Sequence, residues 1–502
     1  MKNSVFVRCI SFVIVILMLA AVFSACAKKD DVDTNKNDNV NKDTVASTSG
    51  DGDGTESETV PDITPLDWDG REYRILGRQS STPWATNWEV WRETVPEDAV
   101  GKAVWQRNQN ILEKYNIYVK GYLETSTVNV ANTMFASGED LYDLTIMFPE
   151  NHHPFAIKGY LIDLYNLDYI NMDHEGWMPY PNKQLTMGGK LFYTTNKFLV
   201  QDKNRCWCVF YNRDLAKELN LGYFEDWVFD GTWTIDKVIE LGKQATYESD
   251  GQPGMGLNDN WGVGAPSAYE LCALFFGGGF RLTEHGNDGY PKLIGATDRI
   301  MQILDKCYAL RGNTEVLYTD IDYGSTNWDD CIGTSFQRGT VCMLFEPFSD
   351  IDTIKSKGNF ELGVLPNPKS DVSQEAYYTI PNLGNGCLFS VPYTVEDREF
   401  AGYALEAITE ESVDTSYRVF IEEKSMLQNA SDEDCAACMR ILFDGVVYDI
   451  GFVSDIGGLG QLAKKSMGVS TFNNYARLFG RIEGSAEQML QRVRDAYAAM
   501  DS

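Results

Sequence analysis

The chain has 502 residues, of which 43% are hydrophobic and 12% aromatic, enough for two or three domains or one large two-lobed unit. Its formal net charge is −30, and it has neither a Lys/Arg-rich run nor a Gly-rich phosphate loop. These features argue against a nucleic-acid partner, because phosphates repel an acidic surface that lacks a basic patch. The dispersed acidic residues are typical of a soluble exported protein.

The first 25 residues have the pattern of an export signal. Lys2 and Arg8 precede an apolar run that is broken only by Ser11 and ends in small residues. A positive start, a short apolar stretch and a small-residue end are typical of a signal peptide. The run is slightly shorter than the ~20 apolar residues that span a bilayer comfortably. We therefore expect residues 1–25 to be a lipoprotein signal peptide, and a retained N-terminal anchor helix is the alternative.

The stretch "FSAC" at residues 23–26 resembles the bacterial lipobox, in which the cysteine thiol is acylated and becomes the new N-terminus. Phe23 departs from that pattern, since leucine is commonest there. Charged and polar residues begin directly after Cys26. This predicts that Cys26 is lipidated and holds the exported protein at the outer face of the cytoplasmic membrane, where several acyl chains give stable anchoring.

Residues 26–62 are predicted to form a disordered acidic tether. They are rich in Asp, Asn, Ser, Thr and Gly and have almost no large apolar side chains, so they cannot bury enough surface to fold. The "DGDG" within them lacks the glutamate that closes a calcium loop, which favours a flexible linker over a metal site.

The body of the chain, from residue 66 onward, alternates strands and helices. Apolar runs and helical spacing predict strands at 72–78, 117–124, 142–148, 339–346 and 360–368, and helices at 99–115, 232–247 and 268–280. Two strands and a helix are expected within 189–221, Thr232 or Thr234 is expected to cap the second helix, and the last hundred residues are mostly helical. This alternation predicts an α/β fold with mainly parallel sheets.

The eleven cysteines show no zinc-binding spacing. Most lie in apolar surroundings, such as "RCWCVF" and "GTVCMLF", where cysteine behaves as a small buried hydrophobic residue. The four histidines include the adjacent His152 and His153, which would point in opposite directions from an extended loop. We therefore predict neither a metal site nor a cofactor.

Four stretches resemble a known family when they are taken in order. They are "YDLTIMFPENHHPFAIKGYLIDL", "WCVFYNRDLAKELNL", "DGTWTIDKVIELGKQAT" followed by "WGV", and "QRGTVCMLFEPFSD" followed by "FELGVLPNPK". Together they resemble the extracellular solute-binding proteins of family 1, which are the receptors of ABC importers and include the maltose-binding type. The segments "YRILGR" and "QEAYYTIP" resemble a branch of large lipoprotein receptors of anaerobic Gram-positive bacteria. The sequence departs from the family pattern at two places, one at Thr340 and the other at Glu346 or Phe348.

The resemblance implies a periplasmic-binding-protein-like fold of type II, with two discontinuous lobes joined by crossing strands. We expect the first lobe at 63–195 with a return at 336–380, and the second lobe at 196–335 with its return and the C-terminal helices at 381–502. Such a protein binds a small molecule between its lobes and presents the closed form to the transmembrane permease subunits. The expected ligand is a mono- or oligosaccharide, and the expected state is a monomer without catalytic activity.

A sugar site stacks aromatic rings on the apolar faces of the sugar and hydrogen-bonds its hydroxyl groups. The loops after the predicted strands offer both kinds of side chain. Trp207 lies among apolar neighbours, so core and cleft positions both remain open, whereas a glutamate at the end of an apolar strand, Glu346, is costly unless it is paired. The candidate ligand-binding residues are Trp84, Trp88, Asn151, Trp207, Tyr269, Glu346 and Phe348.

Two other functions remain open from the sequence. A tethered carbohydrate-active enzyme, either a glycoside hydrolase or a lyase, needs a pair of carboxylates, which 73 acidic residues supply without specificity. The chain has no G-x-S-x-G elbow and no H-E-x-x-H motif. A sensor or adhesin ectodomain could use the same fold without transport.

Overall fold

The computed structural model describes residues 62–80, 86–324, 330–382, 387–468 and 471–500, with the side chains of residues 268, 269 and 323 left aside. The chain divides into two units, residues 1–58 and 59–502, and all the described residues belong to the second. Within the described ranges, no helix is both long and apolar enough to cross a membrane.

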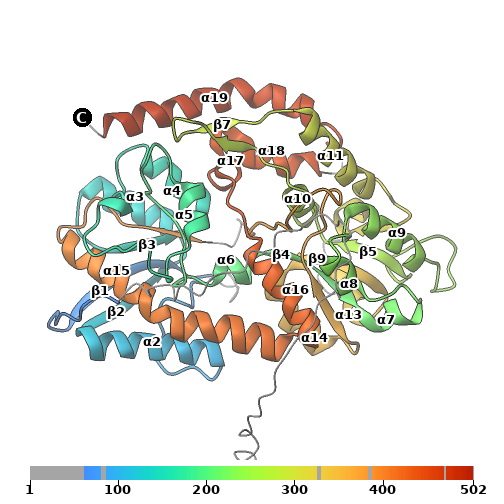
Figure 1. Ribbon diagram of the computed structural model, residues 1–502, viewed down its shortest axis with the longest axis horizontal. Coiled ribbons are helices and arrows are strands. Elements are labelled where there is room, and N and C mark those ends of the chain that lie inside the picture. Colours follow the sequence, from blue (N-terminus) through green and yellow to red (C-terminus); the bar gives the residue numbers. More distant parts are fainter. Residues whose placement is uncertain (1–61, 81–85, 325–329, 383–386, 469–470, 501–502) are drawn as a thin grey trace, which may run out of the picture. The chain divides into compact units, whose positions relative to one another are not determined.

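The first lobe is built on a four-stranded sheet with the order β11-β3-β1-β2. Strand β1 runs parallel to β2 and β3, whereas β11 runs antiparallel to β3. Helices α2, α3, α4 and α15 contact this sheet or one another (Figure 1). The bounds are β1 Arg71–Arg78, β2 Ile117–Glu124, β3 Leu144–Met147, β11 Leu388–Ser390, α2 Ala99–Tyr115, α3 Thr127–Ser137, α4 Pro149–Ala156 and α15 Arg398–Ser412.

The second lobe is built on a five-stranded sheet with the order β10-β4-β9-β5-β8. Strand β5 is parallel to β8 and β9, and β4 is antiparallel to both of its neighbours. The strands are β4 Trp207–Asn212, β5 Trp261–Ala265, β8 Leu317–Thr319, β9 Val341–Pro347 and β10 Leu362–Leu365. The helices are α7 Arg213–Glu218, α8 Phe224–Phe229, α9 Ile235–Ala245, α10 Ala268–Gly277, α11 Asp298–Arg311, α12 Asp320–Tyr323, α13 Ile332–Arg338, α14 Ile351–Lys357 and α16 Glu433–Asp444.

Two sequence-based expectations differ from this arrangement. The sheets are mixed rather than mainly parallel, because β4 and β11 enter antiparallel to their neighbours. The expected return of 336–380 to the first lobe is also wrong, since its strands β9 and β10 both pair with β4 in the second sheet. The return to the first lobe is made by β11 and α15, which were expected in the second.

The two lobes are connected by crossing strands. Cys206 and Pro381 form an antiparallel bridge, with the Asn382 N–H donating to the Arg205 carbonyl at 2.8 Å. A third segment joins them at Val447, whose N–H donates to the Thr379 carbonyl at 2.8 Å. This confirms the expected α/β fold with two lobes joined by crossing strands.

A helix makes a further connection between the lobes. Helix α15 continues into the π-helical segments η4 Val413–Tyr417 and η5 Val419–Asn429. Helix α15 and η4 contact α2 of the first lobe, whereas η5 also contacts α16 of the second. The remaining elements are η2 Leu164–Asn166, α5 Pro179–Leu185, α6 Gln201–Asn204, β6 Thr283–His285, β7 Pro291–Leu293, η3 Phe348–Asp350, α17 Ile450–Val453, η6 Ile456–Gly458, α18 Leu459–Ser466 and α19 Tyr475–Ala499.

Local sequence signals explain the regular elements. Helix α2 begins where the Asp98 carboxylate accepts the Gly101 N–H, and it ends at Asn116, whose positive φ of 51° closes the last turn. Thr234 caps α9, and it is one of the two residues that were expected to do so. Trp233 is fully buried and donates its indole N–H to the Pro366 carbonyl, which makes it a core residue.

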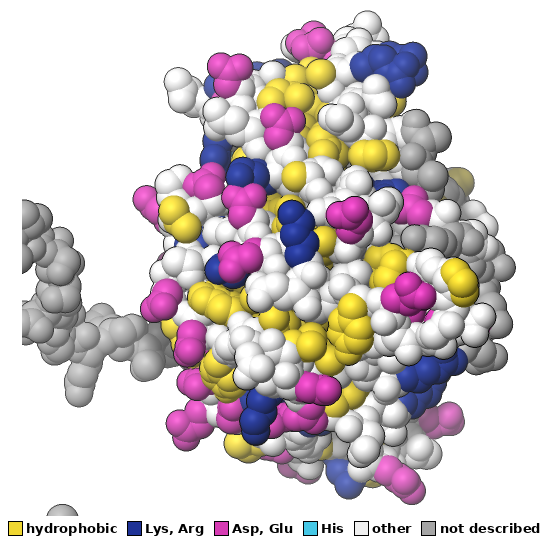
Figure 2. Space-filling view, turned by 90° about the vertical axis from the view of Figure 1, so that its right-hand side faces the viewer, with side chains coloured by type: hydrophobic (Ala, Val, Ile, Leu, Met, Phe, Trp, Pro, Cys, Tyr) yellow, Lys and Arg dark blue, Asp and Glu magenta, His cyan; other side chains and the backbone are white. Residues whose placement is uncertain are grey.

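Nine cysteines lie within the described residues, where no disulfide joins them, and eight are buried. This agrees with their interpretation as small core residues. On the outer surface, Figure 2 shows the face at the right-hand side of Figure 1, where acidic and basic side chains alternate with apolar ones rather than gathering by sign. The negative charge is thus dispersed on this face, as expected from the sequence.

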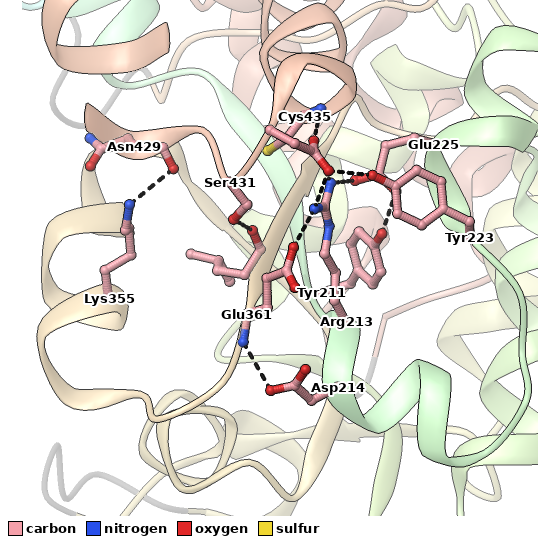
Figure 3. A network of polar contacts seen from close by, with 12 residues as sticks. Tyr211, Arg213, Asp214, Tyr223, Glu225, Lys355, Glu361, Asn429, Ser431 and Cys435 are labelled. Carbon is pink, nitrogen blue, oxygen red and sulfur yellow. Dashed lines mark hydrogen bonds and ion pairs between the residues drawn. The ribbon is translucent and has the colours of Figure 1, made fainter. Parts of the chain in front are cut away.

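An ionic network secures α16 to the second lobe (Figure 3). The guanidinium of Arg213 contacts the carboxylates of Glu225, Glu361 and Asp432. Asp432 is also the N-cap of α16, because its side chain accepts the Cys435 N–H at 2.8 Å. One buried arginine at the start of α7 therefore links α8, the segment before β10 and the start of α16.

Candidate ligand-binding site

Polar side chains from both lobes gather where the crossing strands leave the sheets. Strand β1 ends at Arg78, and β9 carries Glu346 one residue before its end. Arg205, in a crossing strand, lies between them: Asp350 and Glu89 favour its charged form and Arg78 opposes it, while burial lowers its pKa to about 10. Ligands of α/β sheets bind outside the carboxyl ends of strands, so this is the expected position for a site.

The first-lobe side of this region is held by buried hydrogen bonds. The Asn87 side chain accepts the Arg78 N–H at 2.8 Å and donates to Glu89 at 3.4 Å and to the Cys387 sulfur at 3.3 Å. Gln201 of α6 donates to the other Glu89 oxygen at 3.2 Å. Burial raises the pKa of Glu89. The guanidinium of Arg78 also lies 3.9 Å from the Phe148 ring centroid, a cation–π contact.

The second-lobe side consists of three carboxyl groups. Glu270 accepts a hydrogen bond from Ser267 in the first turn of α10, and Asp350 follows β9 in η3. Burial raises the pKa of Glu346 well above its usual range, and the charges of Asp350 and Glu270 raise it further. Burial likewise raises the pKa of Asp350, although Arg205 opposes that shift. Protonated carboxyl groups here would donate hydrogen bonds as well as accept them.

The crossing strands add a third polar group. The Tyr448 hydroxyl donates to Asp202 at 2.6 Å, and the ammonium of Lys203 lies 3.7 Å from the same oxygen. The second Asp202 oxygen has no hydrogen-bond partner although the residue is 2% exposed. A small cavity adjoins it, lined by Pro149, Asp202, Pro381, Cys387, Leu388, Tyr448 and Val453.

The residues that were predicted from the sequence to bind the ligand differ in their burial and in the elements that carry them. Trp88 and Asn151 are half-buried, on the segment after β1 and on α4 respectively. Trp207 is buried at the start of β4, where its carbonyl accepts bonds from Asn367 and Thr379. Trp84 lies outside the described residues, as do Cys26 and the side chain of Tyr269.

Glu346 and Phe348 differ although they are neighbours in sequence. Glu346 is half-buried and belongs to the carboxyl cluster described above. Phe348 is fully buried and packs edge-to-face against Phe443 with centroids 5.0 Å apart. Its N–H donates to the Cys206 carbonyl at 2.9 Å. In this arrangement Phe348 is a packing residue beside the crossing strands, with no surface left for a ligand.

Several site residues were not predicted as ligand contacts. Arg78 and Glu89 flank the first long loop, Arg205 precedes β4, and Asp350 follows β9. A charged residue directly at the end of an apolar strand was the available signal for Arg78. Arg205 and Asp350 had no such signal, because their relation depends on two segments that lie far apart in the chain.

A cluster with metal-ligand chemistry lies elsewhere, at the start of the described chain. Ligand atoms of Asp62, His174 and Glu410 lie within 4.8 Å of one another. However, the His174 Nδ1 accepts the Gly176 N–H at 3.1 Å, which places the proton of the neutral ring on the Nε2 that faces Asp62. Both Glu410 oxygens accept the Ile63 N–H, at 2.8 and 3.0 Å. The hydrogen bonds of His174 and Glu410 therefore use the atoms that a cation would need.

The site can bind a polar ligand by hydrogen bonds from carboxyl, guanidinium and amide groups. It lies between two α/β lobes that are connected by crossing strands. No protein-family model matches the sequence, and a comparison with curated proteins finds no similar one.

Solved structures with a similar fold do exist. A cyclo/maltodextrin-binding protein complexed with maltotetraose gives a TM-score of 0.53 at 13% identity, covering 86% of this chain and 97% of that one. Apo RafE from Streptococcus pneumoniae gives 0.50 at 16% identity, covering 87% and 100%. UspC from M. tuberculosis gives 0.50 at 13% identity, covering 85% and 100%. The expected resemblance to solute-binding proteins is thus confirmed for the fold.

Proposed function

We propose that this chain is the extracellular receptor of an ABC importer and that it captures a carbohydrate between its two lobes. The observation that carries the proposal is the meeting of polar groups from both lobes beside the crossing strands, with Arg205 between Glu89 and Asp350. The similar fold of a maltodextrin-binding protein supports the ligand class.

In this function the ligand selects a closed arrangement of the lobes. Contacts to both lobes at once stabilise the closed form, and the permease subunits recognise that form. The sugar-contacting side chains are proposed to include Trp84, Trp88, Asn151, Trp207, Tyr269 and Glu346. Arg78 and Glu270 join them on the basis of their positions in the site. The protein acts as a monomer without cofactor or metal.

The ligand class is testable by titrating the protein with mono- and oligosaccharides while its melting temperature is followed. A ligand that binds only the folded state raises this temperature by mass action. In Glu346→Ala, we expect the affinity for the sugar found to fall by at least tenfold, since the hydrogen bonds that the carboxyl group offers to the ligand are lost. The exposed Glu315 offers the control Glu315→Ala, which should bind as the unaltered protein does.

The outcomes of this titration separate the candidate functions. Release of reducing sugar with turnover would indicate a glycoside hydrolase instead. Tight sugar binding, together with the absence of a permease gene pair beside this gene, would favour a sensor or adhesin. Binding of peptides or polyamines alone would keep the receptor and replace the sugar.

The membrane anchor is a separate part of the proposal. Cys26 is proposed to carry the lipid, with residues 26–62 as the tether to the extracellular body. Labelling of the cells with a fatty-acid probe should mark the protein, and Cys26→Ala should abolish the mark because the acylated thiol is gone. Absence of the label from the unaltered protein would indicate the retained anchor helix, and labelling that persists in Cys26→Ala would place the lipid on another residue.

A further inference from the structure

The C-terminal helix α19 contacts both lobes. Figure 1 shows it passing from above α11 of the second lobe to above α3 of the first. The hairpin β6–β7 accompanies it, and α19 contacts β7 and η6. We define the C-terminal strap as the hairpin 283–293 together with residues 450–468 and 471–499.

The second-lobe end of the strap is extensively buried. Tyr475 packs edge-to-face on Phe280 at 5.4 Å between centroids and stacks with Phe479. At Gly457 a Cβ would come within 2.4 Å of the Ala486 backbone, so η6 and α19 touch with no room for a side chain. The Asp449 carboxylate accepts the Leu282 N–H at 2.6 Å and the Thr283 N–H at 3.2 Å. The contact of Tyr475 with Phe280 fixes this end to the second lobe, as does the Arg311 side chain of α11, which donates to the Met467 carbonyl at 3.0 Å, while the other contacts hold η6, α19 and the hairpin together.

The first-lobe end of the strap contacts residues 184–193 of the first lobe. Tyr497 packs edge-to-face on Phe192 at 4.9 Å between centroids. The Tyr193 hydroxyl bonds with the Ser454 hydroxyl at 2.8 Å.

The hairpin adds two hydrogen bonds to this end. The Gly188 N–H donates to the Gly289 carbonyl at 3.0 Å, and a ring nitrogen of His285 lies 3.2 Å from the Gln184 carbonyl. Residues 184–194 belong to the first lobe, because Thr194 pairs with Phe389 of β11.

We propose that the C-terminal strap ties the two lobes at points separate from the crossing strands, and that its first-lobe end detaches when the lobes open. Rotation about the crossing strands alone would pull Tyr497 from Phe192 and separate the hairpin from 184–190. The lobes therefore open only as far as this end releases. These contacts lie within the fold, so the strap acts in the same way whichever ligand the site takes.

Hydrogen exchange of the ligand-free protein tests the detachment, with variants matched at the two ends of α19. Tyr475 and Tyr497 are both buried, and neither hydroxyl has a hydrogen-bond partner. Tyr497→Ala should speed amide exchange at least tenfold in 184–193 and 283–293 while leaving β9 unchanged. Tyr497→Phe keeps the ring and removes the unpaired hydroxyl, so it should exchange no faster than the unaltered protein. Tyr475→Ala should instead affect 475–486.

Thiol modification tests whether detachment opens the lobes. Cys387 is buried in the candidate site, whereas Cys342 is buried within β9 of the second sheet. Tyr497→Ala should raise the rate of N-ethylmaleimide modification of Cys387 at least threefold and leave Cys342 unchanged. Faster exchange of the hairpin without faster modification of Cys387 would overturn the proposal, as would equal modification of both cysteines. Unchanged hairpin exchange in Tyr497→Ala would overturn it as well.

Discussion

Glu406 is a buried carboxyl group whose surroundings favour its protonated form. One oxygen accepts the Trp177 indole N–H at 2.8 Å and the Asn171 N–H at 3.1 Å, while the other has no hydrogen-bond partner. Burial raises its pKa to about 8, and that of Glu410, one turn further along α15, to about 7. Both groups bind a proton more tightly in the folded chain than in the unfolded chain.

This raised pKa makes stability depend on pH. The unfolded chain loses the Glu406 proton near the usual value, whereas the folded chain keeps it until about pH 8, so stability falls as the pH rises between these values. We expect Glu406→Gln to remove a part of this decrease, on the order of 1–3 kcal/mol between pH 5 and 8. Thermal unfolding of both proteins across this range measures it. An unchanged pH slope in Glu406→Gln would show that Glu406 ionises normally.

At the scale of single elements, the strong local signals were predictive. Helix α2 has the bounds 99–115 that its amphipathic spacing predicts, and Asp98 and Asn116 explain both ends. In contrast, β11 has only three residues and pairs with β3, which lies more than 230 residues earlier in the sequence. No local pattern therefore predicts this strand. The π-helical continuation of α15 also lacks a signal, because its apolar spacing is close to that of an α-helix.

Among the contacts between elements, we expect the ionic network of Arg213 to have the largest effect on the free energy of unfolding. Glu225 is fully buried, and without Arg213 its carboxylate keeps only the Tyr211 hydroxyl and loses its countercharge. Removing one partner of a buried ion pair costs about 3–5 kcal/mol. We expect Arg213→Met to lower the free energy of unfolding by this amount in urea titrations.

A matched exposed pair provides the control for Arg213→Met. Arg299 pairs with Asp371 with about half of its side chain exposed, so Arg299→Met should cost below about 1 kcal/mol. Similar losses in the two variants would mean that the network of Arg213 contributes no more than a surface pair.

At the scale of the whole molecule, the sequence predicted the fold class but not which lobe each late segment joins. Strands β9 and β10 flank β4, and an apolar strand looks the same whichever sheet accepts it. The same limit applies to the candidate site, because local sequence does not show which residues come together. Glu346 was predicted from its own cost of burial, while Arg205 and Asp350 become partners only through the fold.

The contact of Glu410 with Ile63 has a mechanical consequence. Together with the Tyr403 hydroxyl, which donates to the Thr64 carbonyl at 2.9 Å, it holds the first described residues on α15 of the first lobe. In a protein anchored at Cys26, tension along the tether would act first on this helix of the first lobe and would reach the second lobe only through η4, η5 and the crossing strands. The first lobe would then stay in place at the cell surface, while the second lobe rotates about the crossing strands.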